Sequence, residues 1–241
     1  MIYFGIDGSQ PRARLEGLRE APVLYSVYRG LPMAYFDTFS KIALDTGAYP
    51  SWKAGETKVD FDEYFDIALA SHNSYPFEFV ASDMSVDWDF TTTMHHCQLM
   101  RNYDLPAIPA FKQGEDLGYL DYLVDQQDEI DYIGIGATDK DTQSFSTGQW
   151  LEQVFERICD SRGRPKIKVH GFRLVGYYER YPFYSCDSTS WAQRKLPDLK
   201  KAAPWGKDEE LMPLVVSYYT RMQSAPRYTG AAQTVLELKS A

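Results

Sequence analysis

The sequence predicts an α/β protein: a single-domain (βα)8 barrel of the TIM type with a short C-terminal appendage. Apolar runs of strand length alternate with segments of helical period, as in parallel βα units. Three of the runs lead to an aspartate: Asp45 in IALDTGAY, Asp83 in FEFVASDMS and Asp187 in PFYSCDSTSW. The 241 residues suit one such barrel, which typically has about 250. We expect one domain over 1–241, with a barrel core over about 22–196 and the appendage over about 197–241.

The strands and helices can be placed from these patterns. We expect seven strands, over residues 22–27, 42–45, 78–82, 107–111, 132–135, 167–170 and 184–187. Helices are expected over 61–71, 117–127 and 150–160, the last with its apolar residues on one face. An eighth strand is not evident. A helix-like stretch over 209–222 either closes the barrel or belongs to the appendage.

The three aspartates are the best indication of function. A βα barrel gathers the carboxyl ends of its strands around one opening, so carboxylates far apart in sequence can converge there on one substrate. Each aspartate could instead cap the helix that follows its strand. Taken singly, capping is the commoner role, but three such residues in order favour a catalytic site.

Charge is unevenly distributed along the chain. The net charge of −9 argues against a nucleic-acid partner, but residues 1–150 carry −14 and residues 151–241 carry +5. The basic half could provide a surface for phosphate groups, or it could simply be solvated. The residues proposed for nucleic-acid binding are Arg162, Arg164, Lys166, Arg194 and Lys195.

Several other classes of protein are disfavoured. No apolar stretch reaches the roughly 20 residues of a membrane span, and the first residues do not resemble a signal peptide, so we expect a cytoplasmic protein without a membrane partner. The three cysteines include no CxxC pair, which argues against disulfides and a cysteine-rich zinc site. The adjacent His95 and His96 lack a matching set of metal ligands. Gly134-Ile135-Gly136 does not complete a dinucleotide-binding motif, so a nicotinamide enzyme is disfavoured.

At its strand ends the sequence resembles the tRNA-guanine transglycosylase family, particularly the short phage and bacterial relatives that act on DNA. Asp45-Thr46-Gly47-Ala48-Tyr49 is similar to the family's Asp-Ser-Gly-Gly-Phe. Ala81-Ser82-Asp83 resembles the segment that ends in its base-recognition aspartate, and Ser185-Cys186-Asp187-Ser188 the segment that holds its nucleophile. The resemblance covers roughly residues 22–191. It implies exchange of guanine in a polynucleotide for a 7-deazaguanine, in a queuosine-related reaction.

The resemblance implies a role for each aspartate. Asp187 would attack the sugar carbon and form a covalent glycosyl-enzyme. Asp45 would be the general base that takes a proton from the incoming base. Asp83 would accept hydrogen bonds from the N–H groups on the Watson–Crick edge of guanine.

Further contacts are expected around the base. Gln113 and Gly114 resemble the family's Gln-Gly pair, and Gly134 and Gly136 could donate backbone N–H groups to the base carbonyl. Tyr49 could stack on a flipped base, although an aromatic after a turn is as often core. His170, at the end of its strand, could contact ligand or phosphate or could pack at the barrel rim.

The sequence also departs from the family. The tRNA enzymes carry a C-terminal zinc site of three cysteines and a histidine, whereas no cysteine or histidine follows Cys186 here. We therefore expect no metal or other cofactor, and DNA rather than tRNA as the polymer, in a host cytoplasm if the protein is phage-encoded. The incoming 7-deazaguanine, a protein partner and a homo-oligomer remain open. The alternatives are an N-glycoside hydrolase that releases a base, and a non-catalytic subunit that binds nucleic acid for a transglycosylase complex.

Overall fold

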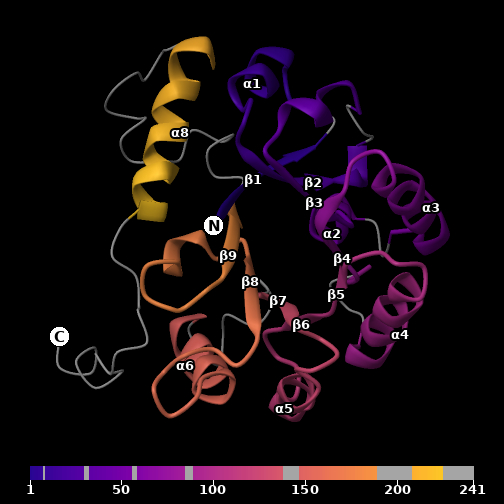
Figure 1. Ribbon diagram of the computed structural model, residues 1–241, viewed down its shortest axis with the longest axis vertical. Helices are drawn as coiled ribbons and strands as arrows, with labels where there is room; N and C mark the ends of the chain where they lie inside the picture. The colour runs from indigo at the N-terminus through magenta and orange to yellow at the C-terminus, as the bar shows by residue number, and fades with distance from the viewer. Residues whose placement is uncertain are drawn as a thin grey trace.

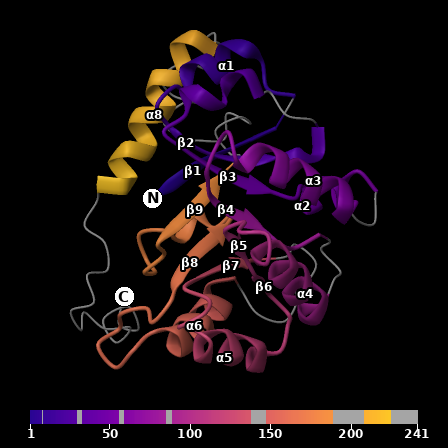
Figure 2. The ribbon, with the colours of Figure 1, turned by 45° about the vertical axis from the view of Figure 1, so that its right-hand side comes forward.

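The chain folds into a ring of parallel strands surrounded by helices, in a computed structural model (Figures 1 and 2). The structure describes residues 1–7, 9–29, 33–55, 59–84, 89–137, 147–188 and 208–224. The strands are β1 Ile2–Asp7, β2 Pro22–Ser26, β3 Lys41–Asp45, β4 Phe77–Ala81, β5 Ala107–Ile108, β6 Ala110–Lys112, β7 Tyr132–Gly136, β8 Lys168–Phe172 and β9 Ser185–Ser188. Their order in the sheet is β5-β4-β3-β2-β1-β9-β8-β7-β6.

The ring closes between β5 and β6. These two strands are separated only by Pro109, which has no N–H and so interrupts the hydrogen-bond ladder of a single longer strand. β4 pairs with β5, and β6 pairs with β7, both in parallel. Counting β5 and β6 as one strand gives the eight parallel strands of the predicted barrel.

The strand that the sequence did not reveal is the first. β1 pairs in parallel with both β2 and β9, so the barrel begins at Ile2 and not at residue 22 as expected. Its residues Ile2 to Ile6 are all buried. A strand covered on both faces reads as a continuous apolar run without alternation, which is how this segment appears in the sequence.

Helices cover the outside of the ring. They are α1 Arg12–Gly17, α2 Ala48–Lys53, α3 Phe61–His72, α4 Phe90–Arg101, α5 Leu117–Asp125, α6 Thr147–Ile158 and α8 Asp208–Ser224, with short 3₁₀ turns at Val27–Arg29, Met33–Thr38 and Val175–Tyr177. α3, α4 and α5 begin at Asp60, Asp89 and Asp116, whose side chains accept hydrogen bonds from the first-turn N–H groups. Within the described residues, no helix has the length and apolar character needed to cross a membrane.

The last helix is part of the barrel wall. α8 lies within the segment expected as an appendage, and it packs beside α1 in both views (Figures 1 and 2). Its Tyr219 is buried, with its ring edge-to-face on Phe4 of β1 at 5.0 Å between centroids. α8 therefore covers the point where the first and last strands meet.

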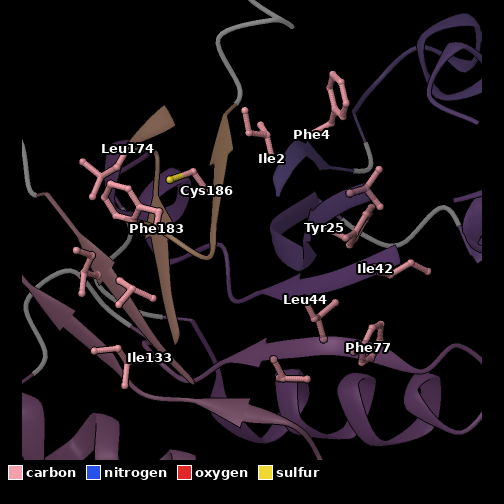
Figure 3. Close-up of a cluster of buried hydrophobic side chains, with 14 of the residues drawn as sticks. Ile2, Phe4, Tyr25, Ile42, Leu44, Phe77, Ile133, Leu174, Phe183 and Cys186 are labelled. Atoms are coloured by element: carbon pink, nitrogen blue, oxygen red, sulfur yellow. The ribbon is translucent and has the colours of Figure 1, made fainter. Parts of the chain in front are cut away.

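The main core lies between strands and helices. Residues of alternate strand positions, such as Phe4, Leu44 and Ile133, point outward and form one large apolar cluster with the helices (Figure 3). The other positions point into the barrel, where Tyr3, Leu24, Phe79 and their neighbours form a second, smaller cluster. The interior is thus filled by side chains and forms no open channel between these residues.

Candidate active site

The carboxyl ends of the strands form the candidate site, which we call the mouth. Register pairs Asp7 of β1 with Ser26 of β2, and Ser26 with Asp45 of β3, so these inward-facing positions lie in one row. Asp83 follows β4 by two residues, and Asp187 lies in β9. The three predicted aspartates therefore come together at one end of the barrel, as expected.

Asp45 is held in a turn and does not cap a helix. Its Oδ2 accepts a hydrogen bond from the N–H of Gly47 at 3.2 Å, and Gly47 itself is the N-cap residue of α2. Gly47 has φ +77, and a Cβ there would lie 2.6 Å from Cβ of Tyr28. A glycine at position 47 is thus needed for this backbone path.

The protonation of Asp45 depends on the other two aspartates. Burial first, then the negative charges of Asp83 and Asp187, raise the pKa of Asp45 to about 8. The residue as a whole is partly exposed. A carboxyl group whose pKa is raised toward neutral pH is suited to act as acid and base in turn.

Asp83 lies opposite a lysine that the sequence analysis did not identify. Burial raises the pKa of Asp83 to about 6, and the positive charge of Lys112 opposes this rise. Lys112 is buried at the end of β6. Oδ1 of Asp83 is buried and accepts no hydrogen bond from the described residues, so an acceptor is available for a donor from a ligand.

Asp187 is enclosed, with 3% of its surface exposed. Its Oδ1 accepts a hydrogen bond from the N–H of Arg173 at 2.8 Å and lies 3.3 Å from Nε2 of His170. No other hydrogen bond from the described residues reaches its carboxyl group, which leaves Oδ2 for a substrate. The position of Asp187 is set by neighbours on β8 and the turn that follows it.

His170 differs from the expectation that it contacts ligand or phosphate. It is fully buried inside the barrel, and its Nδ1 shares a hydrogen bond with Oγ of Ser185 at 2.6 Å. The reason is register: β8 continues to Phe172, so His170 lies one inward-facing position below the rim. The histidine lies beneath the opening and reaches it only through its contact with Asp187.

Tyr49 lies in α2 near the mouth, but its ring is already in contact with a cation. The guanidinium carbon of Arg173 is 3.6 Å from the centroid of the ring. The backbone of Arg173 has φ 60, which is unusual for a residue other than glycine, and its N–H is the one bonded to Asp187. A base that stacked on this face of Tyr49 would have to displace Arg173.

The expected contacts to the base carbonyl are only partly available. Gln113 and Gly114 follow β6 at the mouth, and the N–H of Gln113 donates to the carbonyl of Gly136 at 2.9 Å. The N–H of Gly134 already donates to Pro109 at 2.8 Å, and the ring of Phe172 covers its Cα, where a Cβ would be 2.3 Å away. Gly134 therefore serves packing inside the barrel and cannot donate to a ligand as predicted.

The predicted phosphate-binding residues do not share the mouth. Arg162, Arg164 and Lys166 lie in the connection from α6 to β8, which is at the end of the barrel where strands begin. Arg164 is also paired with Asp160 at 3.3 Å. The expectation of a phosphate-binding surface came from the clustering of charge alone, whereas a connection from a helix to the next strand lies at the end opposite the carboxyl ends of the strands. Arg194 and Lys195 lie outside the described residues.

Two further residues at the mouth carry charge. Glu115 accepts a hydrogen bond from the N–H of Lys112 at 2.7 Å, and burial raises its pKa. Together with Lys112 it forms a small polar group next to Asp83. In the sequence, only their position next to Gln113-Gly114 could have indicated that Lys112 and Glu115 lie at the site. A Lys or Glu beside a turn is usually solvated, so this position alone did not identify them.

Metal binding finds no support in the described part of the chain, where no group of three or more His, Cys, Asp and Glu residues could hold an ion. His96, one of the adjacent pair, stacks on Phe61 of α3 at 4.0 Å between centroids. The three cysteines are free thiols, and Cys97 and Cys186 are buried.

Comparison with known proteins identifies no family for this chain. No family model and no curated protein matches the chain. A solved structure described as a putative fructose-1,6-biphosphate aldolase from Coccidioides immitis is similar with a TM-score of 0.48 and 10% identity, over 92% of this chain and 89% of that chain. A likeness this distant gives no information about the reaction.

Proposed function

We propose that the protein is a transglycosylase that exchanges guanine in a polynucleotide, DNA in preference to tRNA, for a 7-deazaguanine. The observation that carries the proposal is the electrostatic coupling of three carboxyl groups from β3, β4 and β9. The negative charges of Asp83 and Asp187 both raise the pKa of Asp45, so the two carboxyl groups lie close enough to Asp45 to act on it at one mouth. Groups whose environments separate their pKa values are suited to different roles in one reaction.

The first half of the reaction breaks the bond between the sugar C1′ and N9 of guanine. Oδ2 of Asp187 attacks C1′ and forms a covalent ester, while the bonding electrons move to N9. The departing guanine needs a proton, and Asp45 holds one below about pH 8. Asp45 therefore acts first as a general acid.

The second half reverses these roles. N9–H of the incoming 7-deazaguanine transfers its proton to the Asp45 carboxylate, and N9 attacks C1′. The ester bond to Asp187 breaks, and both aspartates return to their starting protonation. Proton transfer by such a positioned group contributes about 10²–10⁴-fold to the rate.

Asp83 supports recognition of the base. Its buried Oδ1 accepts no hydrogen bond from the described residues, and guanine and its 7-deaza analogues present N–H donors on the Watson–Crick edge. Gln113 at the neighbouring strand end would contact the base carbonyl. A base in a duplex must be extruded to reach this position, so single-stranded or opened sites should react best.

The proposal is tested by base exchange on single-stranded DNA, duplex DNA and tRNA with a panel of 7-deazaguanines, read as modified nucleosides by mass spectrometry. Asp187→Asn should abolish exchange and form no covalent adduct. Asp45→Asn should form the adduct slowly and fail to pass it to the incoming base. The matched control is Asp7→Asn at the same rim, where the carboxylate is held by the N–H of Ser9 at 2.8 Å and no role is assigned.

Different products separate the alternatives. Exchange that persists in Asp187→Asn would refute the assigned nucleophile. Free guanine without incorporation would indicate an N-glycoside hydrolase. No reaction with any polymer, in protein whose fold is intact, would favour a binding subunit that needs a catalytic partner.

A further inference from the structure

A chain of polar groups runs through the apolar interior of the barrel. Tyr132 of β7 shares a hydrogen bond with Oγ of Ser185 at 2.5 Å, and Ser185 shares one with Nδ1 of His170 at 2.6 Å. Nε2 of His170 lies 3.3 Å from Oδ1 of Asp187. The four residues are between fully buried and 7% exposed. Buried polar groups are costly unless they are partnered, so the hydrogen bonds among Tyr132, Ser185 and His170 restrict the positions of these three residues.

The direction of the hydrogen bonds follows from the two ends of the chain. Burial raises the pKa of Tyr132 well above its ordinary value, so its hydroxyl keeps its proton, and Ser185 is the acceptor within reach. Ser185 then donates its own proton to Nδ1 of His170, which must be unprotonated. In the reverse direction, the Tyr132 hydroxyl would have no acceptor among the described residues, and a lone pair of Nε2 would face the Asp187 carboxyl group.

The surroundings of His170 favour a neutral ring. The rings of Phe172, Phe79 and Tyr3 surround the imidazole at 4.6, 4.7 and 5.9 Å between centroids. Burial lowers the pKa of His170, and the amino group of Met1 acts in the same direction, whereas Asp187 opposes it. A neutral ring with Nδ1 unprotonated carries its proton on Nε2.

We infer that His170 is a positioning residue: the chain from Tyr132 through Ser185 fixes it as the neutral Nε2–H tautomer, whose N–H dipole holds Oδ1 of Asp187. The contact is electrostatic and is not an aligned hydrogen bond, since Nε2 forms none with the described residues. The N–H of Arg173 holds the same oxygen from the other side. Oδ1 is thereby anchored twice, and Oδ2 is left as the attacking atom in the reaction proposed above, on which this role rests.

The tautomer can be measured without any assay of activity. Histidines labelled with ¹⁵N distinguish a protonated from an unprotonated ring nitrogen in NMR spectra, and the signals of His170 are assigned by their loss in His170→Gln. We expect Nε2 protonated and Nδ1 unprotonated between about pH 6 and 8, around the ordinary pKa of histidine. Ser185→Ala should produce a mixture of tautomers, and Asp187→Ala should shift Nε2. An Nδ1–H tautomer or an imidazolium in the wild-type protein would overturn the inference.

Kinetics then test the consequence for the reaction. His170→Gln keeps an N–H donor near the place of Nε2, whereas His170→Leu removes it. We expect kcat to fall by about 10–100-fold in His170→Leu and Ser185→Ala with little change in KM, as for other residues that orient a reacting group, and to recover partly in His170→Gln. Ile108→Val, a small change in the same barrel interior, is the control and should leave kcat unchanged. Equal losses in the Gln and Leu variants, with the tautomer as expected, would refute positioning through the N–H.

Failure of the proposed function can be distinguished experimentally from failure of the positioning role of His170. If the wild-type protein exchanges no base with any polymer, the NMR experiment still decides whether His170 is fixed as the Nε2–H tautomer toward Asp187. If exchange occurs but the tautomer is wrong, the transglycosylase proposal stands and the positioning role fails.

Discussion

Replacement of Asp45 with asparagine is expected to stabilise the fold, and increasingly so as the pH rises. The pKa of Asp45 is raised from 3.8 to about 8 in the folded chain, so between these values the folded state holds a proton that the unfolded state has released. Stability must therefore fall as the pH rises through this window. An asparagine side chain has no proton to lose, and the variant avoids this loss.

The size of the effect follows from the linkage of protonation to folding. One pKa unit corresponds to about 1.4 kcal/mol, so between about pH 5 and 8 the wild-type protein would lose about 4 kcal/mol relative to Asp45→Asn if the shift were fully expressed. Solvent screening of the partly exposed Asp45 and rearrangement of the neighbouring carboxylates reduce this loss of stability. We expect the advantage of the variant to grow by about 1–3 kcal/mol over this range, measured as the free energy of unfolding in urea.

Asp83→Asn provides the internal control. The pKa of Asp83 is raised only to about 6, so the advantage of this variant should grow from about pH 4 to 6 and then level off. The two variants thus differ in their pH window and not only in magnitude. An advantage of Asp45→Asn that is the same at pH 5 and 8 would show that Asp45 titrates normally, and would remove the proposed acid role.

Three further predictions concern the frame of the site. Gly47→Ala should lower the free energy of unfolding by about 1–3 kcal/mol, because φ is +77 and a Cβ would contact a neighbouring side chain at 2.6 Å; urea unfolding measures this. Tyr219→Ala should cost about 3–5 kcal/mol in the same assay if α8 is part of the barrel wall, and much less if α8 is an appendage. The combined charge reversal of Arg162, Arg164 and Lys166 should leave base exchange unchanged, because these residues lie at the opposite end from the mouth; a large loss of rate would contradict that placement.

The sequence was sufficient to predict the fold class and to predict that three aspartates meet at one end of the barrel. Both depend on local signals, namely the alternation of strands with helices and an aspartate after each of three apolar runs. β1 has the same apolar character as the strands that were predicted, but its pairing with β9, at the other end of the sequence, leaves no local signal. The pairing that closes a barrel is a long-range contact, which local periodicity does not encode.

The interior chain could not be read from the sequence for a related reason. His170 and Ser185 point inward only because of the register of β8 with β9, which pairs these two residues directly. A shift by one residue would turn both toward the helices. The same reasoning explains Gly134, whose Gly-x-Gly pattern suggested an approach to ligand but whose place inside the barrel is filled by Phe172. The sequence pattern identifies which residues belong to a strand. The register between neighbouring strands decides which side chains those residues contact.

The charge at the mouth limits how a polynucleotide can bind there. Asp45, Asp83 and Asp187 gather at one end of the barrel, and fully ionised they would repel the phosphates of any nucleic acid. A proton on Asp45 removes one of these charges, and Lys112 offsets that of Asp83. In the proposed reaction, a neutral base extruded from the polymer would enter where the charged backbone would be repelled. Arg173, an exposed residue beside Tyr49, lies near the mouth on the side where we expect the phosphates. On this account the acidity of the mouth selects for a flipped base, and the phosphate contacts that hold the polymer must come from outside the ring of carboxylates.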